Sequence, residues 1–119
     1  MVCLVQLLFY QVKLFFLAGP RSLDILSEMS VSPADKSQLG KLEYGQSSAM
    51  IHLKGFDGKP RPVGLIMRVS YVGELGYELH MSSAAGESVT SVFDSLMKSE
   101  EVALAGFEAL DAMSLEKGK

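Results

Sequence analysis

Cysteine is almost absent from this sequence of 119 residues, which contains one cysteine, no tryptophan and four prolines. The single thiol, Cys3, cannot form an internal disulfide and cannot supply a zinc site built from several cysteines. These absences exclude a disulfide-stapled scaffold and a zinc knot, and they fit a reducing compartment.

Long hydrophobic runs are absent as well. The apolar opening from Met1 to Tyr10 is interrupted by Gln6 and followed by Gln11 and Lys13, so it falls short of the ~18 residues that a membrane-spanning helix needs. The opening also lacks the basic start of a secretory signal and the arginines of a mitochondrial transit peptide. We therefore expect no membrane contact and no targeting segment in this chain.

Positive charge is sparse, since 11 basic residues stand against 14 acidic ones and the formal net charge is −3. No dense basic run is present, which excludes the electrostatic footprint of a nucleic-acid-binding protein. Glycine-rich nucleotide motifs of the Gly-x-Gly-x-x-Gly and Walker types are missing. His52 and His80 have no second ligand at metal-binding spacing and no partners for a nucleophilic triad. We expect neither a metal site nor a catalytic residue here.

Apolar side chains are abundant, because 48% of the residues are hydrophobic. A compact chain of this length buries roughly two-thirds of its unfolded surface, so it is one domain or a piece of one. Apolar periodicity predicts an α+β fold, a largely antiparallel sheet with packed helices. The expected elements are strands over 11–17, 49–54, 63–72 and 77–81, a helix capped by Ser22, a helix of one or two turns after Ser32-Pro33, a helix carrying Val89, Val92, Phe93, Leu96 and Met97, an apolar run over 102–105, and a helix over 107–116.

The central strands carry the sharpest local expectations. Asp57-Gly58 predicts a tight hairpin turn whose two central residues both have positive φ, and Gly73 and Gly76 predict a second turn with positive φ and close chain approach. Alternation in the strand between these turns places one set of residues on one face and the rest on the other. The first set is Val63, Leu65, Met67, Val69 and Tyr71; the second is Gly64, Ile66, Arg68 and Ser70.

Glu78 is the acidic residue of greatest interest, because it lies in the middle of a predicted strand, where an acidic side chain does not help to form a hydrophobic core. If Tyr77 and Leu79 face the core, Glu78 and His80 project from the other side of the sheet. A solvated strand face is the ordinary explanation of such a residue. The alternative is a ligand with two adjacent N–H donors, which would meet both oxygens of one carboxylate.

Two motifs decide between these alternatives, the run 68–80 (RVSYVGELGYELH) and the run 106–118, which ends in Ser114-Leu115-Glu116-Lys117-Gly118. Together they resemble the folate-binding, aminomethyltransferase-like region of the sarcosine and dimethylglycine dehydrogenase family, a relative of the glycine-cleavage T-protein. Ser114 resembles the sarcosine dehydrogenase type, and Leu110 stands where T-proteins place a folate-contacting arginine. The match runs from Leu17 to Gly118.

The resemblance implies that Glu78 contacts tetrahydrofolate, since it matches the second glutamate of the family's glycine-turn motif. Tyr71 and Arg68, on the preceding strand, are the further cofactor-binding candidates; the Tyr71 ring either flanks a pterin or packs in the core, and packing is favoured. The implied division of the chain is an unplaced segment over 1–13 and a partial aminomethyltransferase-like domain over 14–119.

The implied parent is an enzyme of the mitochondrial matrix that demethylates an N-methyl amine. Its FAD domain and carboxy-terminal barrel would be the partners of this chain, which we expect to capture the one-carbon unit on tetrahydrofolate without independent turnover. Two alternatives remain open. One is a fragment of a glycine-cleavage-type aminomethyltransferase, and the other is a non-catalytic interaction module like the pyruvate dehydrogenase phosphatase regulatory subunit.

Overall fold

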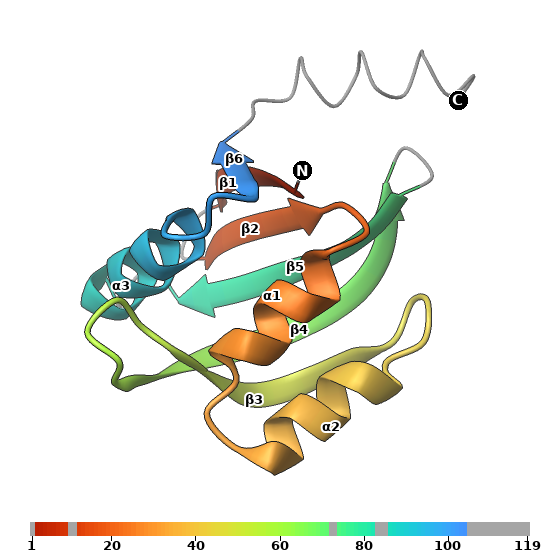
Figure 1. Cartoon of the computed structure of the whole chain (residues 1–119), viewed down its shortest axis with the longest axis horizontal. Coiled ribbons are helices and arrows are strands. Elements are labelled where there is room, and N and C mark those ends of the chain that lie inside the picture. The colour runs from red at the N-terminus through yellow and green to blue at the C-terminus, as the bar shows by residue number, and fades with distance from the viewer. Residues whose placement is uncertain (1, 10–11, 72–73, 83–85, 105–119) are drawn as a thin grey trace.

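The computed structural model describes residues 2–9, 12–71, 74–82 and 86–104, and Figure 1 shows the arrangement of their helices and strands. The expected helix over 107–116 lies outside these residues. In chain order the elements are β1 (Val2–Phe9), β2 (Val12–Ala18), α1 (Ser22–Met29), α2 (Pro33–Lys41), β3 (Ser47–Lys54), β4 (Pro60–Tyr71), β5 (Glu74–Ser82), α3 (Gly86–Met97) and β6 (Val102–Leu104).

One six-stranded sheet organises the described part of the chain, with the strand order β3-β4-β5-β2-β1-β6. Its neighbouring strands are antiparallel except for β1 and β6, which are parallel. The α+β class and the largely antiparallel sheet are therefore confirmed. β1 lies in the segment 1–13 that the sequence left unplaced, and it pairs with β2 from Cys3 to Phe9.

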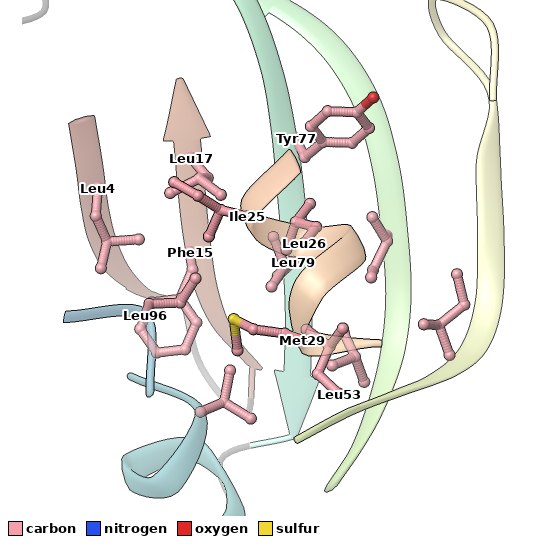
Figure 2. Close-up of a cluster of buried hydrophobic side chains, with 14 of the residues drawn as sticks. Leu4, Phe15, Leu17, Ile25, Leu26, Met29, Leu53, Tyr77, Leu79 and Leu96 are labelled. Atoms are coloured by element: carbon pink, nitrogen blue, oxygen red, sulfur yellow. The ribbon is translucent and has the colours of Figure 1, made fainter. Parts of the chain in front are cut away.

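The main core lies between the sheet and the three helices, and we call this side of the sheet the helix face. Figure 2 shows side chains of α1, β2 and β5 gathered there in one cluster. Phe15 of β2, Leu26 of α1 and Leu79 of β5 are completely buried. α3 buries Val89, Val92 and Leu96 against the sheet, which confirms the helix predicted from their spacing.

The two short helices begin differently from one another. Ser32 caps α2 as expected, because its hydroxyl accepts a hydrogen bond from the Asp35 N–H at 3.1 Å. The prediction that Ser22 caps α1 was wrong. Ser22 is buried and its hydroxyl donates to the Gly19 carbonyl at 2.8 Å, while Arg21 occupies the cap position and its side chain makes no capping hydrogen bond to the helix. The hydroxyl bonds to a carbonyl of the preceding turn and does not cap the N–H groups of the first helical turn.

The β3–β4 turn is longer than the two-residue turn predicted from Asp57-Gly58. β3 ends at Lys54 and β4 begins at Pro60, and the Gly58 N–H donates to the Gly55 carbonyl at 2.9 Å. Gly58 has φ +79°, whereas Asp57 is not among the residues with positive φ. One left-handed glycine in a longer turn therefore reverses the chain.

We expect Gly58→Ala to lower the free energy of unfolding by about 1 kcal/mol, because an L side chain pays to adopt left-handed φ. A Cβ at this position would meet no atom within 4 Å, so the cost is conformational and not steric. Gly40→Ala is the matched control, since Gly40 lies in α2 and a Cβ there also meets nothing within 4 Å. Urea unfolding should show a gain of about 0.5 kcal/mol for that variant. Equal effects of the two substitutions would contradict the turn geometry.

The alternation of side chains between the two faces of the sheet is interrupted at Met50 in β3 and at Gly64 in β4. Met50 has φ +60°, which is uncommon outside glycine, and a Cβ on Gly64 would lie 3.2 Å from the His80 carbonyl oxygen. Val63 and Ile66 are both completely buried although three residues separate them. The prediction that Val63, Leu65 and Met67 share a face was therefore wrong, because the alternation shifts between Val63 and Ile66.

The apolar start of the chain forms strand β1, and none of the described helices is long and apolar enough to cross a membrane.

Candidate functional site

Glu78 projects from the side of the sheet opposite the helix face, which we call the second face. Its strand neighbours Tyr77 and Leu79 belong to the main core and are 1% and 0% exposed. The alternation predicted for β5 is therefore confirmed, and it sends Glu78 and His80 away from the described helices.

The strand register makes Glu78 the centre of a three-by-three grid on the second face. Residues directly opposite one another on antiparallel strands lie on the same face, so the pairing of β2 with β5 and of β5 with β4 defines three rows. These rows are Leu14–His80–Leu65, Phe16–Glu78–Met67 and Ala18–Gly76–Val69. All positions except Glu78 and His80 are apolar, and a carboxylate in such surroundings forms stronger hydrogen bonds than it would in water.

His80 is the polar neighbour of Glu78. Its Nε2 lies 3.1 Å from Glu78 Oε1, and the side chains of His80 and Glu78 are 32% and 28% exposed. A carboxylate offers about four acceptor positions on its two oxygens, so one hydrogen bond through Oε1 leaves capacity for a ligand. His52 and His80 are both half-buried strand residues.

Gly76 contributes to the second face by making room for an aromatic ring. A Cβ on Gly76 would lie 2.9 Å from Phe16 Cζ, and Phe16 forms a small buried cluster with Val5, Ala18 and Val69. The predicted close approach at Gly76 is confirmed. The predicted positive φ at Gly76 was wrong, because the residue lies inside β5 and not in the turn. Gly73 lies outside the described residues.

Arg68 lies on the helix face, away from Glu78. Its backbone pairs with Tyr77, and its Nη1 donates to the Leu42 carbonyl at 2.8 Å. Arg68 Nε is buried with no hydrogen-bond partner in the described structure. Burial raises the pKa of the Tyr77 phenol, and the Arg68 charge partly opposes that rise. The structure thus links Arg68 to the α2–β3 connection and does not bring it to Glu78.

Tyr71 ends β4, where its backbone pairs with Glu74. Its side chain lies outside the described part of the structure. Of the three candidate cofactor-binding residues, the second face therefore holds Glu78, the helix face holds Arg68, and the Tyr71 ring is not placed.

A separate hollow of about 600 Å³ opens on the helix side, between α1, the β3–β4 turn and α3. At the edge of this hollow, Lys98 Nζ lies 4.5 Å from the centre of the Phe56 ring. Asp57, also at this edge, accepts from the Lys59 N–H and pairs with Arg61, and these contacts hold its pKa below the usual carboxyl value. None of the residues predicted to bind a cofactor lines this hollow.

Sequence reasoning missed Phe16 and Met67, the two direct cross-strand neighbours of Glu78. Their identity follows from strand register, which the alternation within single strands does not reveal. Among the described residues, no three or more histidine, cysteine, aspartate or glutamate side chains are grouped so that they could hold a metal ion.

Comparison of the sequence with known proteins identifies its family. Residues 3–119 match the model of the GCVT N-terminal domain. The chain is 36% identical over 104 residues, or 84% of its length, to a protein of Paenarthrobacter nicotinovorans named 4-methylaminobutanoate oxidase (formaldehyde-forming). It is 40% identical over 52 residues, or 44% of its length, to human mitochondrial sarcosine dehydrogenase.

The chain spans 11% of the length of the bacterial relative and 6% of the length of the human one. Both comparisons confirm the resemblance drawn from the runs 68–80 and 106–118. Because the family model covers nearly the whole sequence, the chain belongs to the family of the GCVT N-terminal domain.

Proposed function

We propose that this chain is the tetrahydrofolate-binding part of a sarcosine dehydrogenase-type enzyme and that Glu78 holds the pterin ring. The observation that carries this proposal is the position of Glu78, a half-buried carboxylate at the centre of an apolar grid on the second face. Family membership and the two N-methyl-amine-oxidising relatives support the same assignment.

The chemistry of Glu78 fits the group that it would bind. A pterin presents a ring N–H beside an exocyclic amino group, and two parallel donors suit the two oxygens of one carboxylate. Phe16 and Met67 flank Glu78 across the sheet and limit competition from water. When bound, a reduced folate supplies the nitrogen that accepts the one-carbon unit.

The contribution of this chain is to bind and orient. Glu78 fixes one edge of the ring, and the apolar neighbours keep that edge away from water. Holding an acceptor near the carbon that it receives raises its effective concentration by orders of magnitude. Oxidation of the amine with FAD would belong to another part of a longer protein. The name of the human relative, a mitochondrial sarcosine dehydrogenase, supports a mitochondrial location.

The comparisons and folate binding bear on the two alternative functions. The names of the relatives, an oxidase and a dehydrogenase, favour the amine-oxidising type over a glycine-cleavage-type aminomethyltransferase. A non-catalytic interaction module would need no ligand at Glu78, so folate binding separates that alternative from our proposal.

We expect Glu78→Gln to weaken the binding of (6S)-tetrahydrofolate to the full chain by roughly ten- to a hundredfold, because hydrogen bonds to a charged acceptor contribute about 1.5–3 kcal/mol. Isothermal titration calorimetry measures the affinity. The matched control is Glu87→Gln on α3, whose side chain is 88% exposed and whose loss should leave the affinity unchanged. Equal affinities for the unaltered chain and Glu78→Gln would remove Glu78 from the site, and failure of the unaltered chain to bind would refute the folate assignment.

A further inference from the structure

We infer that His80 is a positioning residue that orients the Glu78 carboxylate and thereby selects ligands with two adjacent N–H donors. This inference rests on the proposed function of the same site. The sequence considered His80 only as a metal ligand or a member of a nucleophilic triad, and it indicated neither role.

The first step is the hydrogen bond itself. Glu78 and His80 are two residues apart on β5, so their side chains leave the same face of the strand. Because an ionised carboxylate can only accept, the 3.1 Å contact with Oε1 is a hydrogen bond in the tautomer that carries the proton on Nε2. Both side chains are about two-thirds or more buried, and the low polarity around them strengthens this hydrogen bond.

The second step concerns what surrounds the imidazole. Directly opposite His80 are Leu14 on β2 and Leu65 on β4, and the diagonal positions nearest to it include Phe16 and Met67. None of these four side chains carries a charge, and Met67 offers only the weakly accepting sulfur of a thioether. Ser82, two residues after His80 on the same face of β5, is exposed. Within the described grid, Glu78 is the one strong acceptor side chain, and the hydrogen bond of Nε2 is directed to it.

The third step follows from carboxylate geometry. When Nε2 donates to the outer lone pair of Oε1, it restrains the plane of the group and leaves the inner lone pairs of Oε1 and Oε2 side by side. These acceptors are arranged for two parallel donors, as in charge-assisted bidentate pairs. A ligand with a ring N–H and an adjacent amino group fills both positions, whereas a ligand lacking the amino group fills one. His80 thus sets the preference for the 2-amino edge of a pterin.

The test compares two ligands with four forms of the full chain. The ligands are (6S)-tetrahydrofolate and its 2-desamino-2-methyl analogue, and the forms are the unaltered chain, His80→Leu, His80→Gln and His52→Leu. We expect His80→Leu to weaken tetrahydrofolate binding about tenfold, as loss of an orienting partner does at other sites, and to weaken the analogue less. The ratio of the affinity for tetrahydrofolate to the affinity for the analogue should therefore be smaller in His80→Leu than in the unaltered chain. His80→Gln, which keeps a donor, should retain most of the affinity and the preference.

His52→Leu is the matched control, because His52 is the second half-buried strand histidine and lies on the edge strand β3. Its backbone N–H, which donates to Asp35 at 3.2 Å, is retained in the variant. Neither affinity should change. An equal loss of both ligands in His80→Leu would show a merely structural role and overturn the inference.

The remaining outcomes separate the two proposals. Failure of the unaltered chain to bind tetrahydrofolate overturns the proposed function together with this inference. Binding that is weakened by Glu78→Gln but unaltered, in strength and preference, by His80→Leu overturns this inference alone. If His80→Leu fails to fold, nuclear magnetic resonance of the His80 ring nitrogens decides: the Nε2 signal should shift in Glu78→Gln, and an unchanged signal refutes the hydrogen bond.

Discussion

Phe15→Ala is expected to lower the free energy of unfolding by about 3–5 kcal/mol, the range for removing a buried aromatic ring. Phe15 is completely buried in β2, and its ring centre lies 5.9 Å from that of Phe93 on α3. Alanine would leave a cavity between the sheet and the helix and would remove this aromatic contact. Because small domains are stable by only about 5–15 kcal/mol, urea unfolding followed by circular dichroism should show a greatly reduced midpoint.

Phe56→Ala provides the matched control for this substitution. Phe56 is 56% exposed in the β3–β4 turn, and the contact in question is that of its ring with Lys98. A solvent-exposed cation–π contact contributes about 0.5–1 kcal/mol, so this variant should unfold close to the unaltered chain. Similar midpoints for the two variants would mean that Phe15 does not lie in the core.

The parts of the fold that the sequence predicted well are those in which one element packs on one surface. α3 presents Val89, Val92 and Leu96 to the sheet at helical spacing, and β5 alternates Tyr77 and Leu79 with Glu78. In both cases the period of the element and the direction of the core agree over the whole length. This agreement is why the sequence alone predicted correctly that Glu78 projects from the face opposite Tyr77 and Leu79.

β1 was not predicted, and its place in the sheet explains why. It lies between β2 and β6, and it contributes Val2 and Leu4 to the main core and Val5 to the second-face cluster. A strand that buries side chains on both faces is read as a continuous apolar run, which periodicity cannot distinguish from other buried segments.

The candidate site was predicted only in part, because its neighbours come from different strands. Glu78 follows from alternation within β5, but Phe16 becomes its neighbour through the β2–β5 register. Arg68 and Glu78 share the motif 68–80, yet Arg68 pairs with Tyr77 and so lies on the opposite face from Glu78. A shift of one residue in a strand reverses the face, and the sequence motif carries no information about that register.

β4 illustrates the same limit within one strand, and it gives the second large prediction. Strict alternation groups Leu65 with Val63 on one face, whereas the structure buries Val63 and Ile66 completely and leaves Leu65 half-buried on the second face. Ile66 is paired with Leu79, another completely buried residue. We therefore expect Ile66→Ala to lower the free energy of unfolding by about 2–5 kcal/mol.

Leu65→Ala is the comparison that makes this prediction decisive, because it changes the adjacent residue of the same strand by a similar volume. Its side chain contacts the second face, so its loss should cost less than about 1.5 kcal/mol, the value for burying one aliphatic side chain only partly. Urea unfolding of the two variants measures the difference. If Leu65→Ala were the more destabilising, the alternation would continue unbroken past Gly64, Leu65 would lie in the main core, and the grid around Glu78 would lose one of its corners. A larger effect of Ile66→Ala instead supports the shift at Met50 and Gly64, the feature that places Leu65 opposite His80 and so completes the apolar surroundings of the carboxylate.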